Sequence, residues 1–374
     1  MANGFSLGVL QTIRDITKQA APQDKLEPVG MLGSLKIAHS PGIIMNDSGA
    51  GHTKTVTVKH KKRFTPAQTS TVDSCETTNT QPYFENTVSV ANYRQIAIHL
   101  EDVVVAQYDE YASAMQSGGT IPLTPMMWEL YDHIKSAASA LNQAVNEDVL
   151  TLALAAMGVN RTTGVNTATT LNIPLNTVNN PLGDSINQML YDFQFNSFTG
   201  RPIVVGSGML HKWMLQQNAK SADQAGLSSR IQAAGLDFWV DNILGTVEAD
   251  ADAIAVYEKD SIQLVEWLRN RGAFAGTKGT STFGVIGLPM DAGNGTTQTM
   301  MYDYQLKYND CAEEFGYVDG VEAVTLQRGW NMIISKHFGL YTIPTNAYRV
   351  GDVLAGNRGS LLYTFTNDCV ECPA

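Results

Sequence analysis

Two cysteines near the C-terminus, Cys369 and Cys372, form the one CxxC motif of the chain. A structural zinc site needs a second pair of ligands at matching spacing, and the sequence has no other CxxC and no HxxxH pair. A thioredoxin-like redox motif opens a helix after a strand, whereas this pair follows the apolar residues 361–365 in a terminal segment. The spacing therefore favours neither metal binding nor redox catalysis.

A glycine pair at residues 206–208 invites comparison with a dinucleotide-binding loop, because it follows a predicted strand and precedes a predicted helix. That fingerprint requires a third glycine, and Leu210 and His211 stand where it should follow. Ser207 is better interpreted as a plain helix N-cap. The segment therefore predicts a capped helix and no phosphate site.

Two further segments approach known motifs and miss them. Residues 272–278 resemble a Walker A loop, but Thr277 separates the last glycine from Lys278, so the lysine is misplaced for a phosphate. Residues 279–284 miss the nucleophile elbow GxSxG by one position. Neither segment predicts catalysis.

The remaining acidic, histidine and cysteine residues do not form a catalytic set. Glu248, Asp250 and Asp252 alternate like half of a calcium loop, without the glycine and the closing glutamate. His133 lies on a predicted helix and is expected to face solvent or a neighbouring subunit. Cys75 has no histidine near it in sequence. We therefore predict no catalytic, cofactor-binding or metal-binding residue, and a protein that is not an enzyme.

The composition limits the class of protein. The chain has 374 residues, of which 44% are apolar and 16% are charged, and the net charge is −11. An average soluble domain has about 25% charged residues, so much of this surface is uncharged and suits burial against other copies. The acidic balance argues against non-specific nucleic-acid binding. The chain lacks 18 consecutive apolar residues and a basic leader, so we expect no membrane span and a protein made in the cytoplasm.

The first half of the chain predicts segments that depend on support. Residues 5–18 carry a helical apolar stripe, and residues 20–51, rich in proline and glycine, need contacts to hold them. Alternation then begins at residue 53 and returns at Val88 and Val90 and again over residues 96–100, which indicates an extended β-hairpin with a long polar connection. Such a hairpin is not stable alone, so we expect it to lie across a neighbour.

The clearest predicted element is a long helix over residues 124–157. Thr124 is a suitable N-cap, Pro125 a suitable first residue, and Gly158 a suitable terminator. Apolar residues recur along one stripe, which we expect to face the core: Met127, Leu130, Ile134, Ala137, Leu141, Val145, Val149, Leu152 and Ala156.

The second half mixes helices and strands without regular βαβ alternation. Helices are predicted over residues 184–195 and 209–217, and buried strands over 202–205 and 253–257. An edge strand is predicted over 262–267, and further strands over 284–289, 298–308, 321–326 and 330–334. The fold class is therefore α+β.

In this order, the elements resemble the major capsid protein of tailed bacteriophages, which has the Hong Kong 97-like fold. The resemblance rests on the hairpin at residues 54–100, the capped helix at 124–157, the stretch 198–206, and the strand 252–257 followed by 262–269. It implies five parts: an N-terminal arm (1–51), an extended hairpin called the E-loop (52–100), a peripheral domain with its spine helix (101–200), an axial domain (201–340) and a β-rich return to the peripheral domain (341–374).

The resemblance also implies the function. Many copies would form hexamers and pentamers that close an icosahedral shell around phage DNA, without sequence-specific binding to that DNA. Such a protein is assembled in the host bacterial cytoplasm and resides in the virion, with portal, scaffolding or decoration proteins as further partners. Two alternatives stay open: an encapsulin-like compartment shell, and an α+β enzyme whose active site is split between subunits. A tail-tube or other virion component is a third.

The hairpin and the C-terminus carry the residues that we expect at contacts between subunits: Lys59, Lys61, Lys62, Arg63, Cys75, Cys369 and Cys372. A solvated or intersubunit role for the basic cluster is favoured over nucleic-acid contact. Some members of the family crosslink lysine to asparagine, but no partner asparagine is evident here. Reduced thiols are favoured over disulfides. The short arm predicts no fused scaffolding segment, which the intact mass of subunits from mature particles tests.

Overall fold

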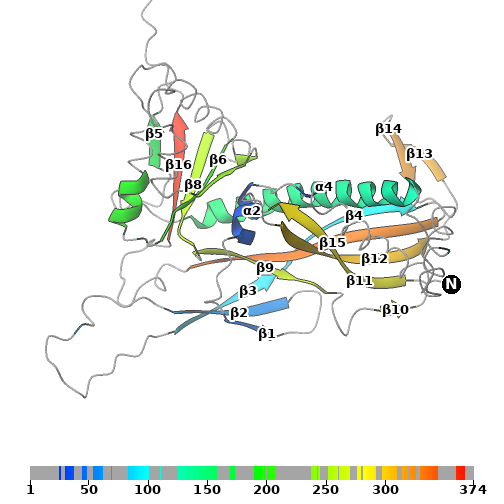
Figure 1. Ribbon diagram of the computed structural model, residues 1–374, viewed down its shortest axis with the longest axis horizontal. Coiled ribbons are helices and arrows are strands. Elements are labelled where there is room, and N and C mark those ends of the chain that lie inside the picture. Colours follow the sequence, from blue (N-terminus) through cyan, green and yellow to red (C-terminus); the bar gives the residue numbers. More distant parts are fainter. Residues whose placement is uncertain are drawn as a thin grey trace, which may run out of the picture. The chain divides into compact units, whose positions relative to one another are not determined.

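The structure is a computed structural model of residues 1–374 (Figure 1). It describes residues 25–26, 30–37, 44–48, 54–61, 69, 83–100, 110, 125–157, 169–172, 189–196, 198, 200–207, 237–241, 243–244, 252–259, 261–269, 276–278, 281–291, 297–309, 314–318, 321–325, 329–343 and 359–366. The expected helices at 5–18 and 209–217 lie outside these residues.

The chain divides into two compact units, each built from three separate stretches of sequence. Unit 1 comprises Met1–Pro28, Asn92–Val145 and Glu266–Phe338. Unit 2 comprises Val29–Ala91, Asn146–Val265 and Gly339–Ala374. The five-part division of the capsid family stays a prediction.

A three-stranded antiparallel sheet in unit 2 contains the predicted hairpin. Its strands are β1 (Ile44–Ser48), β2 (Lys54–Lys61) and β3 (Tyr83–Val90), in that order. The pairing of β2 with β3 brings Val56 opposite Val88. The hairpin pairing predicted from alternation is therefore confirmed for these two strands.

A six-stranded sheet holds the next strand of the chain, β4 (Asn92–Leu100). The other strands are β9 (Ile262–Trp267), β10 (Gly276–Lys278), β11 (Ser281–Asp291), β12 (Thr297–Asn309) and β15 (Gly329–Thr342). The order is β10-β11-β12-β15-β4, with β9 also paired to β15. We expected residues 96–100 to continue the hairpin, and this was wrong, because β4 pairs with β15 along its whole length.

A five-stranded sheet in unit 2 has the order β5-β16-β8-β6-β7. Its strands are β5 (Thr169–Asn172), β6 (Ile203–Gly206), β7 (Asp237–Val240), β8 (Asp252–Tyr257) and β16 (Ser360–Thr366). All residues of β6, and residues 253–257 of β8, are buried, as their uninterrupted apolar runs predicted. A separate two-stranded ladder joins β13 (Glu314–Val318) to β14 (Val321–Thr325).

The long helix α4 spans Pro125–Ala156, which confirms the predicted helix and its proline at the first position. The apolar stripe is buried as expected at Ile134, Val145 and Val149. Leu152 was expected on this stripe but is 38% exposed, and Ala153 takes the buried position instead. The buried series Leu141, Val145, Val149 and Ala153 advances in steps of four residues, so the next buried position after Val149 is 153 and not 152.

The N-terminal region contributes buried structure to its own chain. The helix α2 spans Gly30–Ile37, with Met31, Leu32 and Leu35 all buried. Further upstream, the Leu26 N–H donates to the Pro289 carbonyl at 2.8 Å, which forms a bridge to β11. Part of the expected arm is therefore held by contacts within its own chain.

The described residues are mostly strands with few helices, and the connections do not alternate regularly, which confirms the α+β class. Residues 189–195 are helical, in agreement with the predicted helix 184–195. Among the helices of this described part, none has the length and apolar character needed to cross a membrane.

Candidate functional site

The predicted intersubunit residues fall partly within the structure. Lys59 and Lys61 lie on β2, opposite Glu85 and Tyr83 of β3. The register therefore places an acidic residue on β3 opposite Lys59. Lys62, Arg63, Cys75, Cys369 and Cys372 lie outside the described residues.

One half of the hairpin, in which residues 54–58 pair with residues 86–90, is covered by other parts of the same chain. Val58 and Val90 are buried, whereas Thr55 and Thr57 on the other face are half-buried. Strand β15 is part of this cover. Its residue Gly339 lies so close to β3 that a β-carbon added there would be 2.7 Å from the carbonyl oxygen of Ser89. We expected the hairpin to lie across a neighbour, but this half has its support within unit 2.

The structure also places two of the rejected motifs. Gly276 and Lys278 lie on β10, which pairs with β11, so the Walker-like lysine is a strand residue and does not precede a helix. Ser207 is buried directly after β6, and the helix that it was expected to cap lies outside the described residues.

The other candidate ligands remain separate. His133 is exposed on α4, which agrees with its expected place at solvent or a subunit contact. Asp252 is the first residue of β8, while Glu248 and Asp250 lie outside the described residues. Within the described ranges, no group of three histidine, cysteine or acidic side chains is placed to hold a metal ion.

A buried ion pair in unit 1 was missed by sequence reasoning. Lys336 is 2% exposed, and its Nζ lies 3.0 Å from Oε1 of Glu266 on β9. The ammonium also stands over the Tyr302 ring, 5.0 Å from the ring centroid. An aromatic face attracts a cation, so the ring and the carboxylate together offset the cost of burying the charge.

The same cluster connects the sheet to α4. The Asn142 side-chain amide donates a 2.8 Å hydrogen bond to the Tyr302 hydroxyl oxygen. Burial raises the pKa of Tyr302 well above its usual range, and the nearby Glu266 carboxylate adds to this, while the Asn142 hydrogen bond opposes it. Tyr302 is therefore a neutral hydroxyl that fastens the helix to β12.

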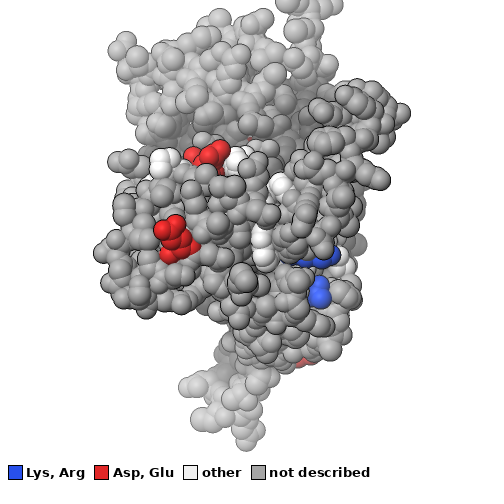
Figure 2. Space-filling model, turned by 90° about the vertical axis from the view of Figure 1, so that its right-hand side faces the viewer, with Lys and Arg blue, Asp and Glu red and all other residues white. Residues whose placement is uncertain are grey.

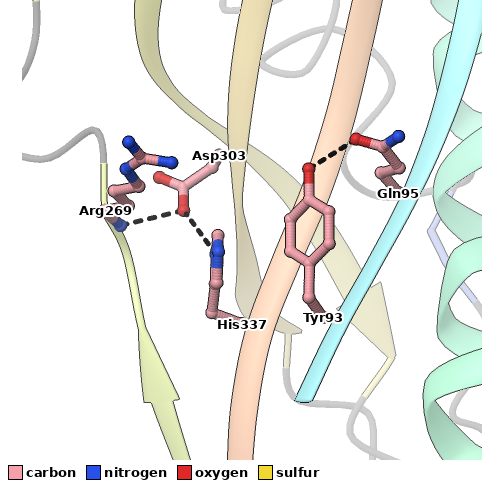
Figure 3. A network of polar contacts seen from close by, with 5 residues as sticks. All are labelled: Tyr93, Gln95, Arg269, Asp303 and His337. Atoms are coloured by element: carbon pink, nitrogen blue, oxygen red, sulfur yellow. Dashed lines mark hydrogen bonds and ion pairs between the residues drawn. The ribbon is translucent and has the colours of Figure 1, made fainter. Parts of the chain in front are cut away.

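A second polar cluster surrounds Asp303, which is almost fully buried (Figure 3). Its Oδ2 accepts a 2.8 Å hydrogen bond from the Arg269 backbone N–H and lies 3.7 Å from Nδ1 of His337. The imidazole is flanked by the Tyr93 ring at 4.5 Å and the Trp267 ring at 5.5 Å between centroids. These contacts join β4, β9, β12 and β15, so the cluster fixes the sheet.

A third polar cluster lies in unit 2, at the N-terminus of α2. Oδ2 of the buried Asp241 accepts hydrogen bonds from the Met31 N–H at 2.9 Å and from the Asn146 side-chain amide at 2.8 Å. Oδ1 accepts the Ile243 N–H at 2.9 Å, and Oδ1 of Asn146 accepts the Leu32 N–H at 2.8 Å. We call this set, with Gly30, the α2 clamp.

Sequence signals for these clusters differ in strength. Lys336 interrupts an alternating series of buried apolar residues, Met332, Ile334 and Phe338. A lysine at such a position could have indicated a buried charge with a partner. The α2 clamp had no such sign, because its side chains come from positions 95 and more apart in sequence.

The described surface carries a stacked pair of exposed aromatic side chains. Tyr191 and Phe195 are 54% and 43% exposed, and their rings stack with centroids 5.8 Å apart. On the face in Figure 2, the charged side chains of the described residues are few and stand in small groups.

The comparisons with known proteins concern the fold. No protein-family model matches the chain, and no curated protein matches it. A solved structure from Mycobacterium phage Che8 is similar with a TM-score of 0.38 and 10% identity, covering 85% of each chain. One from Mycobacterium phage Adephagia has a TM-score of 0.40 and 12% identity, covering 91% of each chain. The capsid of Ralstonia phage GP4 has a TM-score of 0.36 and 11% identity, covering 85% of this chain and 83% of that chain.

Proposed function

We propose that this chain is the major capsid protein of a tailed bacteriophage. The observation that carries the proposal is the order of its elements. The β2–β3 hairpin with its long connection comes first, the 32-residue helix α4 follows, and the strands of the five-stranded mixed sheet and of the six-stranded sheet apart from β4 come after it. This order resembles the Hong Kong 97-like family. In that scheme the hairpin is the E-loop, α4 is the spine helix of the peripheral domain, and the region from about residue 201 forms the axial domain.

The chemistry of the described residues supports a structural role. The buried charges at Lys336, Asp303 and Asp241 bond to neighbouring side chains and backbone groups of their own unit. Their arrangement fastens strands and helices together, which suits a subunit that must keep its shape under load. We therefore propose a virion protein without catalytic activity.

The proposed assembly consists of hexamers and pentamers that close an icosahedral shell around the genome. Assembly takes place in the host cytoplasm, with portal, scaffolding or decoration proteins as partners. The low charge fraction supports extensive contact between copies, because few charges must be desolvated. The acidic net charge of −11 argues against general electrostatic attraction between the chain and DNA, so the proposed shell encloses the genome without binding it through net charge.

Electron microscopy of the full chain tests this proposal, with the protein expressed alone and together with its neighbouring genes. Closed shells tens of nanometres across are the expected result. A uniform monomer or small oligomer under both conditions would contradict it and revive the enzyme with a split active site. Closed shells that hold cargo enzymes and no DNA would favour the encapsulin-like compartment, and open helical tubes a tail component.

A matched pair of charge reversals tests the role of the hairpin. Lys59→Glu combined with Lys61→Glu is expected to reduce shell yield, because both residues lie on the part of β2 that we assign to subunit contacts. Lys259→Glu makes the same kind of change at an exposed residue of unit 2 and is expected to leave the yield unchanged. Equal yields from all variants would remove Lys59 and Lys61 from the interface.

Denaturing gels of the particles test covalent reinforcement. We propose reduced thiols at Cys75, Cys369 and Cys372, so the band pattern is expected to be the same with and without reductant. A ladder that reductant removes would instead indicate disulfides between subunits, and a ladder that persists would indicate isopeptide bonds.

A further inference from the structure

The helix α2 is attached to unit 2 in two ways. Its apolar residues Met31, Leu32 and Leu35 are 0%, 2% and 4% exposed. Its polar attachments are the α2 clamp and the contact of the Ser34 hydroxyl with the Tyr257 hydroxyl at 2.6 Å. A helix of eight residues is marginal when isolated, so its helical state depends on these contacts.

The α2 clamp converges on one carboxylate. Asp241 accepts three N–H groups, and its own backbone N–H donates to the Gly206 carbonyl at 2.8 Å, which fixes the residue to the end of β6. The fit is close, because Gly30 has φ of +31° and a β-carbon there would collide with the Asp241 carboxylate. Hydrogen bonds to a charged acceptor are stronger than neutral ones, so Asp241 is the main polar anchor of α2.

The neighbouring strands are held differently. Strands β6, β8 and β16 are joined by backbone ladders, with β8 paired on both sides. The polar contacts of α2 with Asp241, Asn146 and Tyr257 are made through the side chains of those three residues. The free energy of local opening differs from one element to another, so an element attached through side chains can open while a ladder of paired strands stays closed.

We propose that α2 is a latch that opens and closes on unit 2 as one piece while the β6–β8–β16 sheet stays folded. Asp241 is the positioning residue that keeps the latch closed. When closed, the latch fixes Gly30, the first residue of α2, against Asp241 of unit 2; when open, it releases that residue. The latch is a property of each subunit, and its use in presenting the N-terminal region during assembly rests on the proposed function.

Hydrogen exchange measured by mass spectrometry on the full chain tests the latch. In Asp241→Asn, an NH2 group replaces one of the two carboxylate oxygens that accept hydrogen bonds, so at least one of these bonds is lost. Exchange over residues 30–37 is therefore expected to become about ten- to a hundred-fold faster. Exchange in β8 and β16 is expected to stay unchanged. The matched control is Asp192→Asn, which alters another buried carboxylate of unit 2, bonded to the Tyr363 hydroxyl at 3.0 Å, and is expected to leave α2 unchanged.

Two results would overturn the latch: unchanged exchange over residues 30–37 in Asp241→Asn, or an equal rise over α2, β8 and β16, which would make α2 an inseparable part of the core. If the variant does not fold, the wild-type chain still decides. In the wild-type chain, the α2 amides must exchange through an opening that has a lower free energy and a weaker dependence on urea than the opening that exposes the β8 amides. If the α2 and β8 amides show the same opening free energy at all urea concentrations, the proposal is overturned. Electron microscopy of the same samples reports shell formation separately.

Discussion

Asn142 of α4 and Tyr302 of β12 are joined by a 2.8 Å hydrogen bond in which both side chains are buried. Tyr302→Phe would leave the Asn142 amide without its acceptor, and we expect a loss of about 1–3 kcal/mol in the free energy of unfolding. Urea-induced unfolding of the full chain measures this cost.

The double variant Asn142→Leu with Tyr302→Phe is the control for that interpretation. Replacing both partners by apolar groups removes the unpaired donor, so the double variant is expected to lose less than the sum of the single changes. Strict additivity would show that the hydrogen bond does not couple the helix to the strand.

The buried pair Lys336 and Glu266 predicts an asymmetric response. Glu266→Gln leaves the Lys336 ammonium buried without its carboxylate, and we expect a loss of about 3–5 kcal/mol. Lys336→Met together with Glu266→Leu removes both charges and is expected to cost much less. Lys307→Met, at an exposed lysine of the same sheet, is expected to change stability by less than about 0.5 kcal/mol. A small effect of Glu266→Gln would place the Lys336 charge in contact with solvent.

The buried tyrosines predict a loss of stability in alkaline solution. Burial raises the pKa of Tyr341 to about 12, above the ordinary tyrosine value of about 10. The unfolded chain therefore loses this proton at a lower pH than the folded chain, so the contribution to stability is complete below about pH 10 and is lost as the pH rises through about 12. Urea unfolding as a function of pH is expected to show a falling free energy over this window.

Tyr341→Phe is expected to reduce the slope of the unfolding free energy against pH in this window by the contribution of about one proton. It also removes a buried hydroxyl that has no hydrogen-bond partner among the described residues, so stability at neutral pH is expected to stay equal or to rise. Burial also raises the pKa of Tyr302 and of Tyr363, where the Asp192 carboxylate adds to the effect, so part of the fall must remain. An identical pH profile in Tyr341→Phe and wild type would contradict the assignment.

Gly339 of β15 predicts a steric effect on the hairpin. In Gly339→Ala the new β-carbon would lie 2.7 Å from the Ser89 carbonyl oxygen and 3.2 Å from a Val88 methyl group, so β3 must move. We expect a loss of about 1–3 kcal/mol and faster hydrogen exchange in β3. Gly200→Ala is the comparison, because that site has φ of +83° and open space around it, so its cost of about 1–2 kcal/mol comes from the backbone alone. Unchanged exchange in β3 of Gly339→Ala would show that the hairpin is free of β15.

The sequence by itself determined the elements whose signals are local. Alternation at residues 53–58 and 88–90 predicted the valine face of β2 and β3, because successive strand residues point to opposite sides. The helix at 125–156 followed from its proline and its repeating apolar stripe, and the error at Leu152 amounted to one position. Uninterrupted apolar runs predicted the buried strands β6 and β8. These signals need only the nearest residues along the chain.

Only the tertiary structure decided which elements meet. Alternation gave the two faces of β4 but not its partner β15, which lies more than 200 positions further on in the chain. The charge at Lys336 became interpretable once β9 placed Glu266 beside it. The α2 clamp depends on Gly30, Asn146 and Asp241, whose separations in sequence leave no periodic signal. Partner choice is a competition among many long-range pairings, and packing of the whole unit, not local propensity, decides it.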